Sequence, residues 1–178
     1  MRKSLKYNGF LLCLVLLCQC SSLQKASHGL WREVKPADYG EGDSNRLTPS
    51  RFLLVALAMP QLEGYLAAAG KSEPEGQLFT LPSPAGEALE FTVWKNSVVS
   101  EELLEKYPEL QTYQGKTVSG APATLRLENS TKGLIAMVTP QEGMPWYIAP
   151  YIKNQNVYMI FDKEAFPDGA PPYSESTQ

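Results

Sequence analysis

The sequence predicts an α+β domain that is mainly an antiparallel β-sheet, built from hairpins and accompanied by two short helices. Two observations lead to this prediction. Several short segments alternate apolar and polar residues, which is the period of a strand with one buried face. Turn-forming residues separate these segments at regular intervals, and this spacing favours an antiparallel sheet or sandwich. The chain of 178 residues has the length of a single domain.

The beginning of the chain has the pattern of an export signal. Basic residues precede a short apolar run over 10–18, whereas a membrane-spanning helix needs about 20 apolar residues. Cys20 follows in a sequence similar to a bacterial lipobox, so we expect a lipoprotein signal peptide over 1–19 and lipidation of Cys20. Gln19 stands where a small residue is usual, which leaves ordinary cleavage and free secretion as the alternative. We therefore expect an exported protein, either secreted or held at the outer membrane or in the periplasm, with a lipid anchor as its only membrane attachment.

Composition divides the rest of the chain into three regions. Residues 20–50 are a polar leader, in which only Leu30 and Trp31 are expected to dock on the core. A β-rich domain is expected over 51–164. Residues 165–178 are rich in proline, glycine, serine and acidic residues, which is typical of a disordered tail or linker.

The first expected elements of the β-rich domain are a strand and a helix. A continuous apolar run over 52–57 suits a buried strand, although a buried helical segment has the same pattern. A short helix is expected over 60–69. Pro60 suits the first turn of a helix, and Gly70 suits the position just after its end.

A β-hairpin is expected next. A strand over 77–81 leads into a proline- and glycine-containing turn over 82–87, and a second strand follows over 89–94. Because side chains alternate between the two faces of a strand, Phe91 should lie on the buried face and Trp94 on the opposite face.

The second helix and the remaining strands complete the predicted sheet. A helix of about two turns is expected over 101–107, because Ser100 is a suitable N-cap and residues before Pro108 avoid the helical conformation. Alternating segments separated by turns follow. They predict strands over 123–128, 134–139, 146–152 and 157–162.

Residues able to carry catalysis are scarce. Zinc hydrolases need two or three histidines on the metal, and serine or cysteine hydrolases need a base beside the nucleophile. The chain has one histidine, His28, and it lies in the polar leader. The carboxylates that could form a catalytic pair, which we interpret as solvated charges, are Glu90, Glu101, Glu102 and Asp162. We therefore expect neither an enzyme nor a site for a metal or cofactor.

Aromatic residues are the best candidates for binding a partner. Exposed aromatic side chains on strands can form a protein-binding or sugar-binding face, although cross-strand aromatic pairs that only stabilise the sheet are more common. The candidates are Trp94, Tyr113 and Trp146. Nucleic acid is not expected as a partner, because the formal net charge is −3 and no basic patch is present.

Several short sequences occur in the order and spacing of a known family. They are Leu81-Pro82 with Gly86, Phe91-x-Val93, Glu102-Leu103 with Tyr107-Pro108-Glu109, Thr112-Tyr113-x-Gly115 and Ile148-x-Pro150-Tyr151. Together they resemble the N-terminal pro-domain of secreted, reprolysin-like zinc metalloproteases (metzincins) of Bacteroidetes, over roughly 30–163. Members of that family continue into a catalytic domain with the motif H-E-x-x-H-x-x-G-x-x-H, which this sequence lacks.

The resemblance implies a pro-region that assists folding of a protease and keeps it inactive until cleavage. We therefore expect a non-catalytic, pro-domain-like module that acts in trans on a secreted zinc metalloprotease, or the remnant of a truncated precursor. The alternative is a cell-envelope lipoprotein whose sheet binds a glycan or an outer-membrane protein.

Overall fold

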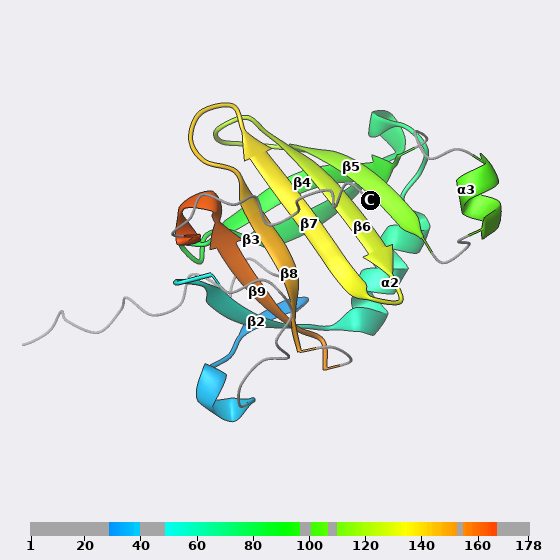
Figure 1. The fold of residues 1–178 in the computed structure, drawn as a ribbon. Helices are drawn as coiled ribbons and strands as arrows, with labels where there is room; N and C mark the ends of the chain where they lie inside the picture. The colour runs from blue at the N-terminus through cyan, green and yellow to red at the C-terminus, as the bar shows by residue number, and fades with distance from the viewer. Residues whose placement is uncertain (1–28, 40–48, 97–100, 107–109, 153–154, 167–178) are drawn as a thin grey trace, which may run out of the picture.

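The computed structural model describes residues 29–39, 49–96, 101–106, 110–152 and 155–166. Within these ranges, nine strands form one antiparallel sheet in the order β1-β2-β9-β8-β7-β6-β5-β4-β3 (Figure 1). The strands are β1 (Trp31–Glu33), β2 (Leu53–Leu57), β3 (Gln77–Pro82), β4 (Ala88–Lys95), β5 (Gln111–Thr117), β6 (Ala123–Ser130), β7 (Gly133–Pro140), β8 (Trp146–Ile152) and β9 (Val157–Asp162). The predicted fold class is confirmed.

Strands β3 to β9 form an up-and-down meander, in which each strand pairs with the next one along the chain. The exception is β2, which pairs with β9, as in the register Leu53↔Ile160. Helix α2 (Met59–Ala68) therefore connects β2, near one edge of the sheet, to β3, which is the opposite edge strand. Helix α3 (Glu101–Lys106) lies between β4 and β5 in the chain.

The sheet coils so strongly that its two edge strands meet. In Figure 1, β3 and β4 pass behind β7 and β8. The indole Nε1 of Trp31, on edge strand β1, donates a hydrogen bond of 2.7 Å to the carbonyl oxygen of Thr80 on the other edge strand. A side chain thus satisfies a backbone acceptor that no strand ladder reaches.

The core fills the interior of this coiled sheet. It contains apolar residues from every strand, including Phe91, Val138 and Ile160. Leu62 and Leu66 of α2 are buried in the same cluster, so the helix covers one end of the coil. We call this the closed end. The opposite end, which we call the open end, holds the turns β3–β4, β5–β6 and β7–β8 together with the start of β2 and the end of β9.

A second apolar cluster lies on the outer face of β8, β9 and β2. Phe161 and Tyr147 stack there with ring centroids 5.7 Å apart. Short segments cover this face: Val34 precedes the 3₁₀ turn η1 (Pro36–Asp38), and Phe166 follows η3 (Lys163–Ala165). The sheet is consequently buried on both faces along β8 and β9.

Several predicted boundaries need correction. The helix expected over 60–69 begins one residue earlier, at Met59, and ends at Ala68. The polar leader contributes strand β1, and Leu30 and Trp31 are core residues as expected. The expected tail begins too early, because Ala165 is buried. Strand β5 has no counterpart among the predicted elements.

Other predictions concern parts of the chain outside the described residues. These are the signal peptide over 1–19, lipidation of Cys20, the end of the second helix at 107 and the tail over 167–178. They remain predictions.

At the closed end, Tyr158 links β9 to β7 and α2. Its hydroxyl accepts a hydrogen bond of 3.3 Å from the backbone amide of Leu134 and lies 3.8 Å from Sδ of Met59. Desolvation raises the pKa of Tyr158, and the hydrogen bond from Leu134 partly opposes this shift. The protonated phenol is therefore favoured in the folded state.

We expect Tyr158→Phe to lower the free energy of unfolding by about 1–3 kcal/mol, because the buried amide of Leu134 loses its acceptor. The raised pKa also predicts a pH effect. The unfolded phenol titrates near pH 10, so the stabilising contribution of Tyr158 is present below that pH and is lost as the pH rises through the folded pKa. Urea unfolding of the wild-type chain and the variant at pH 8 to 11 measures both the loss of stability and its dependence on pH. If the free energy of unfolding fell equally steeply with pH above pH 10 in the variant and the wild type, this reasoning would be contradicted.

Candidate functional site

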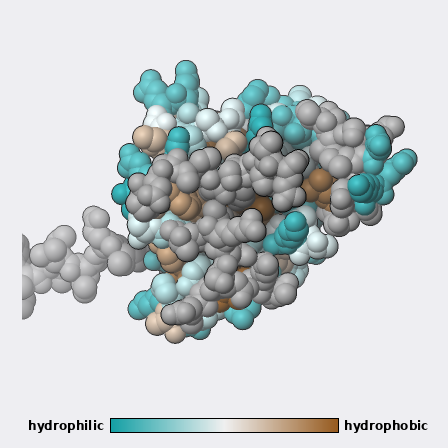
Figure 2. Space-filling view, viewed as in Figure 1, coloured by the Kyte–Doolittle hydropathy of each residue, from teal (hydrophilic) through white to brown (hydrophobic). Residues whose placement is uncertain are grey.

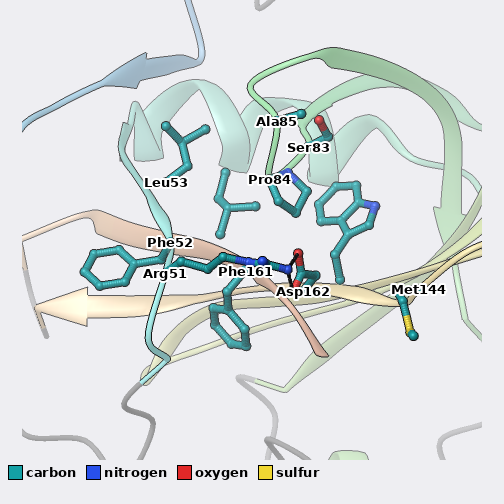
Figure 3. Close-up of a pocket in the computed structure, with 11 residues that line it drawn as sticks. Arg51, Phe52, Leu53, Ser83, Pro84, Ala85, Met144, Phe161 and Asp162 are labelled. Atoms are coloured by element: carbon teal, nitrogen blue, oxygen red, sulfur yellow. Dashed lines mark hydrogen bonds and ion pairs between the residues drawn. The ribbon is translucent and has the colours of Figure 1, made fainter. Parts of the chain in front are cut away.

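The main candidate site is a cavity of about 510 Å³ at the open end. Figure 3 shows it between the start of β2, the β3–β4 turn and the end of β9. The residues that line it are Arg51, Phe52, Leu53, Ser83, Pro84, Ala85, Met144, Trp146, Ile160, Phe161 and Asp162. Its volume lies in the range of small-molecule binding sites.

The walls of the cavity are mostly apolar and come from opposite parts of the coiled sheet. Trp146 and Ile160 belong to the core, so the inner wall is part of the rigid interior. Pro84 and Ala85 line another side of the cavity, from the β3–β4 turn (Figure 3). The cavity thus lies between the β3–β4 turn and the ends of β2, β8 and β9, at the opposite end of the coil from α2.

The β3–β4 turn holds its side of the cavity in a fixed shape. The amide of Gly86 donates to the carbonyl of Ser83 at 2.9 Å, and the amide of Ser83 donates to the carbonyl of Glu87 at 2.7 Å. Gly86 has φ of 82°, a conformation that is strained for residues with a Cβ. Pro84 is at the second position of the turn, where its fixed φ is favourable.

An ionic cluster lies at the rim of the cavity. Nη2 of Arg51 donates to both carboxylate oxygens of Asp162, at 3.0 and 2.9 Å, and to Oε2 of Glu164 at 3.1 Å. Hydrogen bonds to Asp162, and then to Glu164, raise the pKa of Arg51. Asp162 also accepts from the amide of Ala165 at 3.0 Å and so caps η3. The cluster has two carboxylates for one guanidinium and is negative.

The three residues predicted to bind a partner do not come together. Trp146 lines the cavity. Tyr113 faces the core, its hydroxyl donates to Oε1 of Gln111 at 2.8 Å, and desolvation raises its pKa. Trp94 is on the opposite face of the sheet from Phe91, as expected. The exposed fractions of Trp94, Tyr113 and Trp146 are only 8%, 2% and 6%, so none of them offers a large contact area.

Trp94 is covered on the outer face by a neighbouring cation. Nζ of Lys116, on the adjacent strand β5, lies 5.9 Å from the centroid of the indole ring. Glu73 holds this ammonium group at 2.7 Å. A long lysine stem can cover an aromatic ring while its charge stays in water. The exposure expected for Trp94 is therefore not observed, and its role in binding a partner remains a prediction.

Sequence reasoning missed Arg51 and Glu164 and interpreted Asp162 only as a solvated charge. No local pattern could have found the cluster, because Arg51 and Asp162 are 111 residues apart in the chain. They meet because β2 pairs with β9. The turn over 82–87 and Trp146 are the parts of the site that the sequence predicted.

The described residues contain no group of three or more His, Cys, Asp or Glu side chains that could hold a metal ion. Among the helices in these ranges, none has the length and apolar character needed to cross a bilayer. No protein-family model, curated protein or solved structure matches the chain.

Proposed function

We propose that this chain is a non-catalytic, pro-domain-like module that binds the catalytic domain of a secreted zinc metalloprotease and assists its folding, inhibits it, or both. The observation that carries the proposal is where the residues of the family resemblance lie. Gly86 forms the β3–β4 turn, Phe91 and Gly115 lie on β4 and β5, and Pro150 lies on β8. Two of them are positions at which this fold requires glycine, Gly86 with its positive φ and Gly115 with its close backbone contacts, which supports the proposal.

The open end is the surface on which we expect the protease to bind. Its turns and the start of β2 carry three of the large apolar residues that are most exposed in the described parts of the chain. Phe52, Val118 and Met144 have exposed fractions of 37%, 51% and 51%. In the view of Figure 2 the coloured surface is mostly hydrophilic, with small separate apolar patches. Phe52 and Met144 line the cavity, and exposed apolar residues beside a cavity are typical of a protein-binding surface.

The proposal is tested by adding the exported chain to a secreted metalloprotease purified from the same cells and measuring cleavage of a fluorogenic peptide. We expect inhibition that saturates at one equivalent. The double variant Val118→Ser/Met144→Ser should weaken inhibition about tenfold, because each substitution removes apolar contact area. The matched control is Leu78→Ser, since Leu78 is 60% exposed and lies near the closed end. Full protease activity at saturating amounts of the wild-type chain would refute the proposal.

One observation favours the alternative, a binding module of the cell envelope. A cavity of about 510 Å³ lined by an indole ring could hold part of a glycan or a side chain of another envelope protein. A pull-down from the source cells, analysed by mass spectrometry, separates the two functions. Recovery of a zinc metalloprotease supports the first function, and recovery of envelope glycans or outer-membrane proteins alone supports the second.

A further inference from the structure

We infer that the cavity at the open end binds the side chain of a lysine or arginine, flanked by apolar residues, in a partner polypeptide. This inference deepens the proposed function and rests on it only in taking the partner to be a polypeptide. Three features support it: the cavity walls, the charge at the rim and the surface around the cavity.

The walls fit the aliphatic stem of a basic residue. Phe52, Leu53 and Pro84 line the cavity with apolar surface that is at least partly exposed. Lysine and arginine side chains commonly place their methylene groups along such surface and keep the charged group in water. Trp146 forms the floor beneath this surface, with only 6% of its area exposed.

The charge at the rim favours a cation over an anion. Asp162 and Glu164 face the single guanidinium of Arg51, and all the hydrogen bonds that Arg51 makes to them come from Nη2. A carboxylate has about four acceptor positions, so both acidic groups keep capacity for a second donor. The neighbouring turns add Glu87 and Glu142, which are exposed, whereas η3 adds one exposed cation, Lys163. The four carboxylates named here still outnumber the two basic groups, Arg51 and Lys163. An anionic group would meet repulsion here.

The surface around the cavity suits apolar neighbours of the inserted side chain. Phe52 and Met144 line the cavity and are also partly exposed. Figure 3 shows Phe52 and Met144 on opposite sides of the Arg51–Asp162 pair. A peptide that places its basic residue in the cavity can therefore cover apolar surface on both sides of it.

The test measures binding of three pentapeptides to the exported chain without any protease, by chemical-shift changes in amide NMR spectra. Each peptide is acetylated and amidated and has two leucines on each side of a central lysine, glutamate or norleucine. We expect the lysine peptide to bind about fivefold more tightly than the other two. The amide chemical-shift changes that this peptide causes in the protein should be centred on residues 83–87 and 160–164. Because protease inhibition is a separate assay, either proposal can fail without the other.

Variants of the rim give expected effects of opposite sign. Glu164→Gln should weaken binding of the lysine peptide about two- to fivefold, whereas Arg51→Gln should strengthen it by a similar factor, because both carboxylates become free.

Two further variants test the cavity itself and provide a control. Ala85→Trp should reduce binding about tenfold or more, because Ala85 is exposed on the turn and the larger ring fills the cavity. Glu105→Gln, on α3, makes the same charge change as Glu164→Gln away from the cavity and should have no effect.

Three results would overturn the inference. They are a glutamate peptide that binds as tightly as the lysine peptide, weaker binding of the lysine peptide to Arg51→Gln, and no shifts around the cavity at millimolar peptide. Each variant is first compared with the wild-type chain by its amide spectrum, so that a loss of folding is recognised as such.

Discussion

Replacing Trp31 by alanine should lower the free energy of unfolding by about 3–5 kcal/mol, which is the range for truncating a buried Trp. The residue is 4% exposed and packs edge-to-face on Tyr158, with ring centroids 6.3 Å apart. Its hydrogen bond to Thr80 also joins the two edges of the sheet. The substitution therefore leaves a cavity in the core and an unpaired carbonyl on β3.

Urea unfolding followed by circular dichroism measures this loss. A matched variant, Trp31→Phe, keeps most of the apolar volume and removes the Nε1 donor, so it should cost about 1–3 kcal/mol. The difference between the two losses of free energy separates the contribution of core packing from that of the hydrogen bond that joins the two edge strands. A loss below about 1 kcal/mol in Trp31→Ala would show that the edges of the sheet do not depend on this residue.

Replacing Gly115 by valine is the second substitution with a large expected effect, about 3 kcal/mol of lost stability. A Cβ at this position would lie 2.9 Å from the backbone oxygen of Thr92 and 3.1 Å from Cγ2 of Val93. Gly115 pairs with Val93 in the β4–β5 ladder, so the backbone cannot move away without breaking strand pairing. The close approach of the backbone explains why glycine is needed here.

Gly64→Ala is the control for the glycine substitution, and it should raise the stability of the protein where Gly115→Val lowers it. Nothing lies within 4 Å of a Cβ built on Gly64, which is inside helix α2. Alanine there should stabilise the protein by roughly 0.5–1 kcal/mol, through its higher helix propensity. Thermal unfolding of both variants provides the comparison, and a Gly115→Val protein as stable as the wild type would refute the packing argument.

The sequence predicted those elements whose residues carry a strong local pattern. Strand β4 alternates clearly, and α2 has a proline at its start. Strand β5 was missed because Gln111–Thr117 is almost entirely polar and only Tyr113 and Gly115 are buried. Strand β1 was missed because three residues are too few to establish a period.

The coiling of the sheet and the candidate site could not be predicted, because both depend on contacts between distant segments. The pairing of β2 with β9 brings Arg51 to Asp162, and coiling brings Pro84 towards Trp146. Periodicity reports which face of a strand is buried but not which strand lies beside it. Of the residues predicted to bind a partner, only Trp146 therefore lies in the cavity.

The pairing of β2 with β9 also determines when the protein can finish folding during synthesis. Strands β3 to β9 can add to the sheet one hairpin at a time as they leave the ribosome, whereas β2 is made early and pairs with the last strand of the described sheet. Contacts between distant segments form slowly. Until β9 is complete, Leu54 and Val55 lack their partners, and this waiting period is when the nascent chain most needs protection against aggregation.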